Sequence, residues 1–214
     1  MTLNCEMIDL SGKQRVVRAL IDPGSEKSFM REASVKDMEL EALPSVDLTI
    51  EGLYGTRMSQ GKVQVREIKL RNKVEKQNIQ IPVVVVPEIC KPIKKVSRGP
   101  WMNQLSELGI DLSLEQQRFP KETAEMDILL GADGYHKILE DRTIKTCGPV
   151  AIKTTLGWVV CGPAKSQTSE NVARVMFVQT NTEERTDEIV KAFWSLETMG
   201  IQNNEETLKQ ASFD

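Results

Sequence analysis

Ala19-Leu20-Ile21-Asp22-Pro23-Gly24-Ser25 brings an aspartate to the end of an apolar segment and follows it with turn residues. Before it, residues 3–10 and 15–21 have the composition of strands, joined by a tight turn around Gly12. The pattern predicts a hairpin that delivers Asp22 to a loop. Taken alone, Asp-Pro-Gly is also typical of an ordinary exposed turn.

Further strands are expected downstream of this loop. Residues 46–50 and 62–70 alternate like the partners of a second hairpin, and residues 79–86 have the apolar content of a buried strand. Residues 126–130 form a short apolar strand, after which Asp133 is expected to cap a helix that runs to residue 139.

The helical signals are few. Trp101, Leu105 and Leu108 have helical spacing that ends at Gly109, and residues 28–40 can hold a helical turn. Residues 151–160 predict at least one more strand, with Gly157 as punctuation.

Composition is that of an ordinary folded protein. The 214 residues are 40% hydrophobic and 28% charged, with a net charge of −3. Residues 166–214 carry nine acids and four bases, so residues 1–165 are near +2. This charge is too small for phosphate neutralisation, and no direct binding of nucleic acid or membrane is expected. The start of the chain lacks a signal-peptide pattern, which predicts a cytoplasmic protein.

Metal and nucleophile chemistry are not favoured. The four cysteines are widely spaced without a Cys-x-x-Cys pair, and His136 is the only histidine. Free thiols, no metal site and no cofactor are therefore expected. The single histidine also argues against a catalytic serine or cysteine, because every candidate nucleophile would need the same residue as its general base.

Together, five segments resemble the protease of BEL/Pao-type LTR retrotransposon polyproteins, the Pao retrotransposon peptidase family, over roughly residues 1–165. These segments are Ala19-Leu20-Ile21-Asp22-Pro23-Gly24-Ser25 with Ser28-Phe29; Ile50-Glu51-Gly52-Leu53-Tyr54-Gly55; Asp127-Ile128-Leu129-Leu130-Gly131-Ala132-Asp133; Gly148-Pro149-Val150-Ala151; and Leu156-Gly157-Trp158. The resemblance implies a mainly β fold, a retropepsin-like closed β-barrel with a single acid-protease lobe and one or two short helices.

The resemblance also implies roles for particular residues. Asp22 would be the catalytic aspartate, and the active-site loop would be supported by Pro23, Ser25, Leu130 and Gly131. Substrate peptide would be bound by Gly24 and by a mobile flap whose tip is Gly52, Leu53, Tyr54 and Gly55. Glycines at a hairpin tip permit positive φ and close approach, although an ordinary hairpin has the same pattern.

Peptide hydrolysis by carboxylates needs two of them, one to deprotonate water and one to polarise the carbonyl. Aspartic proteases are the standard example of carboxylates that share a proton. The sequence has one such loop, since Asp9 and Asp133 lie in different patterns. The second carboxylate is therefore expected from a homodimer, whose twofold axis brings two copies of Asp22 together.

One residue departs from the family pattern. Pro23 stands where the family usually has Ser or Thr, whose hydroxyl holds the two loops together across the dimer axis. Two further hypotheses follow: a catalytically silent dimerisation or peptide-binding module, and a folded spacer, which would be a monomer.

The chain is expected to divide into residues 1–165, the protease domain, and residues 166–214, an acidic linker with an amphipathic helix. Lys191-Ala192-Phe193-Trp194-Ser195-Leu196-Glu197 resembles the stretch that leads into reverse transcriptase in the same polyproteins, whose Tyr-x-Asp-Asp motif is not included here. The expected partners are a second copy of the chain and a polyprotein peptide, in the cytoplasm or within retrotransposon particles.

Overall fold

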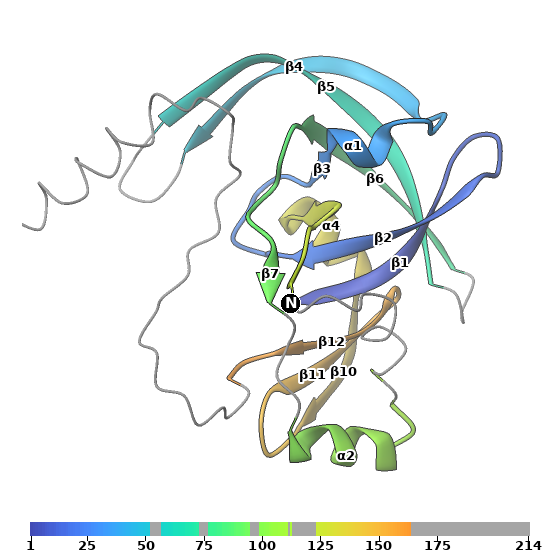
Figure 1. Ribbon diagram of the computed structural model, residues 1–214, viewed down its shortest axis with the longest axis vertical. Helices are drawn as coiled ribbons and strands as arrows, with labels where there is room; N and C mark the ends of the chain where they lie inside the picture. The colour runs from blue at the N-terminus through green and yellow to red at the C-terminus, as the bar shows by residue number, and fades with distance from the viewer. Residues whose placement is uncertain (52–56, 73–76, 95–98, 111, 113–122, 164–214) are drawn as a thin grey trace, which may run out of the picture. The chain divides into compact units, whose positions relative to one another are not determined.

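The computed structural model describes residues 1–51, 57–72, 77–94, 99–110, 112 and 123–163 (Figure 1). The strands are β1 (Thr2–Ile8), β2 (Gln14–Ile21), β3 (Phe29–Arg31), β4 (Glu41–Glu51), β5 (Arg57–Arg71), β6 (Asn78–Val86), β7 (Ile93–Lys94), β8 (Thr123–Ala124), β9 (Ile128–Leu130), β10 (Leu139–Lys145), β11 (Val150–Thr154) and β12 (Gly157–Cys161). The helices are α1 (Glu32–Val35), α2 (Pro100–Glu107) and α4 (Ala132–Ile138). The described part of the chain is thus mainly β with few short helices, as predicted, whereas the expected C-terminal helix lies outside it.

The largest sheet closes on itself as a ring of paired strands. Its order is β1-β2-β9-β3-β6-β5-β4, and β1 also pairs with β5. Most neighbours are antiparallel, but β2 pairs with β9 and β3 pairs with β6 in parallel. Six strands therefore form the ring, and β4 extends from it along β5, in keeping with a single-lobe protease fold.

Strand β9 lies between β2 and β3 and has only three residues, as β3 does. Its residues Ile-Leu-Leu are all buried. Ala19, Leu20 and Ile21 pair with Ile128, Leu129 and Leu130 respectively. Burying an aliphatic side chain stabilises the fold by roughly 1.5–3 kcal/mol, so apolar contacts compensate for the short ladder of hydrogen bonds.

Two apolar clusters pack against opposite faces of these central strands. Because side chains alternate along a strand, Ile21 and Leu130 enter the larger cluster, whereas Leu20 and Leu129 enter a second one. The second cluster also holds Phe29 and includes Leu48 as a partly buried neighbour. The end of β2, where Asp22 follows, is therefore fixed from both sides.

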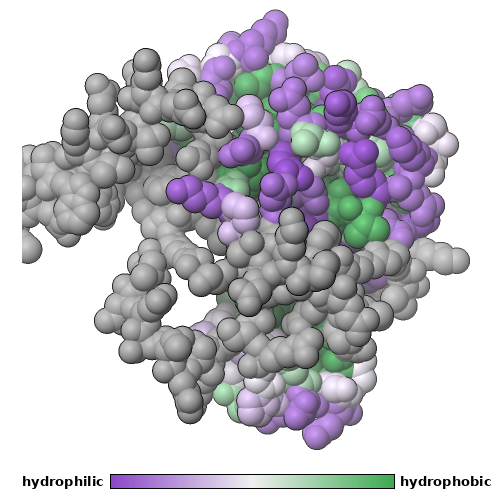
Figure 2. Space-filling model, in the orientation of Figure 1, coloured by the Kyte–Doolittle hydropathy of each residue, from purple (hydrophilic) through white to green (hydrophobic). Residues whose placement is uncertain are grey.

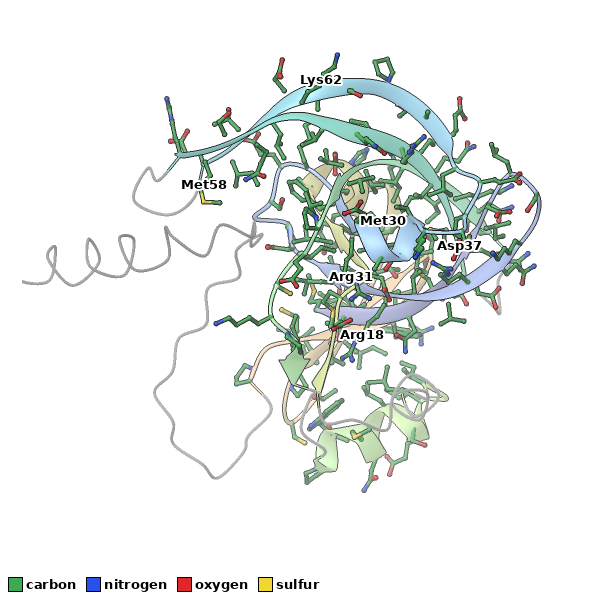
Figure 3. All side chains as sticks on the ribbon, turned by 45° about the horizontal axis from the view of Figure 1, so that its top comes forward. Arg18, Met30, Arg31, Asp37, Met58 and Lys62 are labelled. Carbon is green, nitrogen blue, oxygen red and sulfur yellow. The ribbon has the colours of Figure 1, made fainter. Side chains whose placement is uncertain are left out.

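The predicted second hairpin is present and longer than expected. The β4–β5 ladder begins with the pair Glu41–Glu67 and ends with the pair Glu51–Arg57. Its upper surface is mostly hydrophilic in Figure 2, and Lys62 points outward in Figure 3. The tip that the sequence assigned to a flap, residues 52–55, lies outside the described residues.

A smaller sheet, β10-β11-β12, is covered by α2. Trp101 and Leu105, one helical turn apart, pack with Ala151 of β11. A Cβ at Gly148 would lie 2.9 Å from Trp101 Cδ1, so this glycine permits the close approach of the turn to the indole ring. The helix predicted around Trp101 is confirmed, but Leu108 is its exposed C-terminal cap rather than part of its buried face.

No helix in the described ranges is both long and apolar enough to cross a membrane.

Candidate active site

Asp22 lies where β2 ends and the chain turns. Its N–H donates to Leu130 O at 3.0 Å, which continues the β2–β9 pairing by one step. Its carbonyl accepts a 3.1 Å hydrogen bond from Ser25 N, and its Oδ1 accepts one of 3.1 Å from Gly24 N. The carboxylate is therefore oriented by its own turn, while Asp22 stays half-buried and open to solvent.

Pro23 is the second residue of this four-residue turn. Proline suits that position because its fixed φ matches the turn and no N–H is required there. Both Pro23 and Gly24 are exposed. The substitution that departs from the family pattern is thus compatible with the local backbone.

The other side of the loop is held by Gly131. A Cβ on Gly131 would lie 2.3 Å from Lys27 O and 2.8 Å from Ser25 O, so no side chain fits between these backbones. Ala132 N donates to Ser25 O at 2.7 Å. The structure therefore brings Leu130 and Gly131 directly against the loop that carries Asp22.

Buried Ser28 and half-buried Asp133 form a link behind the loop. Ser28 Oγ donates to Asp133 Oδ1 at 2.6 Å and accepts from Gly131 N at 3.0 Å. Ser28 N also donates to Asp133 Oδ2 at 3.3 Å. One serine thus ties together the end of the active-site loop, Gly131 and the first turn of α4.

The role expected for Asp133 is therefore wrong. Gly131 is the N-terminal cap residue of α4, without a side-chain cap bond, and the carboxylate of Asp133 in the first turn bonds Ser28 instead. Helix α4 ends at Ile138, and Leu139 begins β10. The missed link joins residues 105 positions apart, although both lie in motifs that the sequence singled out.

The remaining predicted site residues differ in what the structure shows. Ser25 Oγ donates to Lys27 O at 2.8 Å, which keeps the loop compact. Gly52, Leu53, Tyr54 and Gly55 lie outside the described residues, and their substrate-binding role stays a prediction. The contribution of Gly24 to peptide binding stays a prediction as well.

The chemistry of the site rests on one carboxylate of this chain. Asp133 is bonded to Ser28, and Asp127 accepts hydrogen bonds from Arg18 N and Ser34 Oγ. The other oxygen of Asp22, Oδ2, accepts no hydrogen bond from any of the described residues. A carboxylate in this position can act as a general base toward water, provided that a second acid polarises the peptide carbonyl.

No group of three or more His, Cys, Asp or Glu side chains in the described ranges is placed to hold a metal ion. The four cysteines are free, and burial raises the pKa of the Cys90 thiol.

Comparison with known proteins agrees with this geometry. No curated protein and no solved structure matches the chain. The family model described as aspartyl protease matches residues 7–133, a range that begins in β1, includes the Asp22 loop and ends at Asp133. Since this match spans more than half of the 214 residues, the chain belongs to the aspartyl protease family.

Proposed function

We propose that the protein is an aspartic endopeptidase that works as a homodimer. The supporting observation is that one half-exposed carboxylate, that of Asp22, lies in a turn braced by Leu130 and Gly131. One subunit offers one such loop, and a twofold axis would supply the second from the same sequence. The two copies of Asp22 then share a proton and activate one water molecule.

The substrate of this enzyme would be an extended peptide of the polyprotein that contains the protease. The motifs that resemble BEL/Pao-type retrotransposon proteases support this assignment. Peptide would lie beside Gly24 under residues 52–55 and add a strand to the site, so that backbone hydrogen bonds give affinity and side-chain pockets give specificity. The tip would act as a flap that excludes water on closure.

The test is cleavage of an immature polyprotein fragment by the purified chain across mildly acidic pH. The wild type should cleave it, and both Asp22→Asn and a pepstatin-type inhibitor should abolish cleavage while the circular dichroism spectrum of the variant stays unchanged. Retained cleavage in the Asp22→Asn protein would rule out Asp22 as the catalytic aspartate.

The shared site adds a second test. Excess Asp22→Asn chain mixed with wild type should lower activity below that of the same amount of wild type alone, because most wild-type subunits then pair with an inactive copy. Activity per chain should also rise with protein concentration. Activity that depends neither on the added Asp22→Asn chain nor on protein concentration would indicate a site completed within one chain.

A catalytically silent peptide-binding module is the second candidate, and Pro23 is the observation that favours it. Proline offers no hydroxyl to bind the partner loop across the axis. Pro23→Ser discriminates between the two: a large gain in cleavage would show that the natural loop is impaired. An unchanged rate, with an active wild type, would show that Pro23 is compatible with a working pair of aspartates.

A further inference from the structure

The position of Asp22 depends on the register of β9. Leu130 O accepts the hydrogen bond of Asp22 N, and Ala132 N, just beyond, bonds Ser25 O. Yet β9 pairs with β2 at three positions and with β3 at two. A slip by one residue would turn Leu129 and Leu130 to the wrong faces and remove both contacts to the loop.

Asp127, immediately before β9, ties this strand to one residue of β2. Its N–H donates to Arg18 O at 2.9 Å, and its Oδ2 accepts from Arg18 N at 2.8 Å. Main chain and side chain of Asp127 therefore hold the same partner residue. The pairing of Ala19 with Ile128 follows as the next step of the ladder.

The same residue also reaches β3 and α1. Asp127 O accepts from Arg31 N at 2.9 Å, and Asp127 Oδ1 accepts from Ser34 Oγ at 2.6 Å and from Arg31 Nη2 at 3.1 Å. In Figure 3, Arg31 lies beside α1, the helix that carries Ser34. Both carboxylate oxygens are thus occupied by donors from both neighbouring strands and the adjacent helix.

Arg31 adds a positive charge to this network, and two carboxylates face it. Burial lowers the pKa of the Arg31 guanidinium, but its hydrogen bonds to Asp127 and Glu125 outweigh that and raise it. Arg31 also pairs with Glu125, whose side chain is 63% exposed, whereas that of Asp127 is 19% exposed. A neutral amide at position 127 would turn an N–H₂ group toward one of these donors, whereas the exposed Glu125 can be replaced without such a conflict.

We propose that Asp127 is a positioning residue for Asp22, which acts by fixing the register of β9 so that Leu130 and Ala132 hold the active-site loop. The proposal rests on the proposed function only for its catalytic consequence. The geometric part concerns the loop itself and is measurable in a protein without detectable protease activity.

The experiment compares Asp127→Asn with Glu125→Gln, which removes the other acid of the same arginine. Amide hydrogen exchange is followed by NMR at Asp22 and Ala132, with Ile68 in the β5–β6 pairing as an internal reference. In Asp127→Asn, protection at Asp22 and Ala132 should fall by at least about tenfold relative to Ile68, whereas Glu125→Gln should leave the ratio unchanged. Equal loss at all three amides, or no loss at Asp22, would overturn the proposal.

The catalytic readout is the split between kcat and KM. Misplacement from a distant change can cost about 10²-fold in rate, so kcat of Asp127→Asn should fall by about 10- to 100-fold with KM nearly unchanged. Should Asp127→Asn fail to fold, Ser34→Ala removes one donor from Oδ1, and the same exchange ratio is measured. An inactive wild type with the expected exchange pattern would count against the proposed function and for the role of Asp127.

Discussion

The two sides of Asp22 are built differently. On the outer side, Pro23 and Gly24 are exposed, and the turn is held by its own short-range hydrogen bonds. On the inner side, Gly131, Ser28 and Asp133 interlock through contacts between segments about 105 residues apart in sequence. The carboxylate of Asp22 is thus positioned from behind by an inner brace, formed by Gly131, Ser28 and Asp133, while its front is left open.

The largest difference between the two sides is expected when one glycine on each side is substituted. Gly131→Ala would place a Cβ 2.3 Å from Lys27 O, a backbone atom that cannot move away cheaply. Overpacking of this kind costs about 3 kcal/mol or more. We expect a loss of that size in the free energy of unfolding, measured by urea denaturation, or a chain that does not fold.

Gly24→Ala is the matched control. Its Cβ would meet Asp22 Oδ1 at 3.2 Å, and the residue is exposed with no requirement for positive φ. Stability should change by less than about 0.5 kcal/mol, while cleavage falls because the carboxylate is displaced. Equal destabilisation by the two substitutions would contradict the division into an inner brace and an open front.

Ser28→Ala tests the brace without adding volume. It removes the donor to Asp133 Oδ1 and leaves the N–H of Gly131 without its acceptor. An unsatisfied buried group costs about 1–3 kcal/mol, and the melting temperature and kcat should both fall. Ser25→Ala, which removes the bond to Lys27 O in the half-exposed loop, should cost less than about 1 kcal/mol. A larger loss for Ser25→Ala would place the main restraint in the loop itself.

Asp9 differs from Asp22 because, among the described residues, its carboxylate accepts three hydrogen bonds in another turn, whereas that of Asp22 accepts one from Gly24 N. The Ser11 hydroxyl, followed by the N–H groups of Glu39 and Lys13, lowers the pKa of Asp9 below its ordinary value of 3.8, against the effect of burial. A lowered folded pKa means that its stabilisation is present above pH 3.8 and is lost as the pH falls through the folded value.

Asp9→Asn should therefore lower the melting temperature at neutral and mildly acidic pH, and the gap to wild type should narrow as the pH falls below about 4. In that variant, kcat at mildly acidic pH should stay at the wild-type value. A gap that stays constant down to strong acid would show that the charge of Asp9 is not the stabilising feature.

Local patterns in the sequence predict the strands that carry the brace, but not the contacts that complete it. The hairpin before Asp22, the longer hairpin and strand β6 follow from alternation and turn residues. β10 was missed because its residues, Leu-Glu-Asp-Arg-Thr-Ile-Lys, are mostly exposed and lack apolar alternation. The closure of the ring by β1 and β5 pairs Met7 with Leu70, and no local pattern specifies such a distant partner.

The same limit applies to the candidate site. Asp22 and Gly131 stand out because a turn and a glycine leave local marks in the sequence. Asp127 and Asp133 look alike there, since each is an acid beside an apolar strand. Their different partners, Arg18 and Ser34 for one and Ser28 for the other, come from 93 to 109 residues away and become visible only in the folded chain.

The smallest expected effects concern two ion pairs of β5, one in the hairpin arm and one in the ring. Arg57 Nε lies 3.1 Å from Glu51 Oε2 with side chains 72% and 55% exposed, whereas Arg71 Nη2 lies 3.0 Å from Glu6 Oε2 with side chains 24% and 12% exposed. Exposed pairs contribute about 0–1 kcal/mol because water and salt screen them. A double-mutant cycle on Glu51 and Arg57 should thus give a coupling energy below about 0.5 kcal/mol that vanishes at high salt.

The cycle on Glu6 and Arg71, which joins β1 to β5, should give the larger coupling because removal of one partner leaves the other charge poorly hydrated. The reverse order would mean that the hairpin arm, and not the closure of the ring, carries the stronger electrostatic restraint on β5.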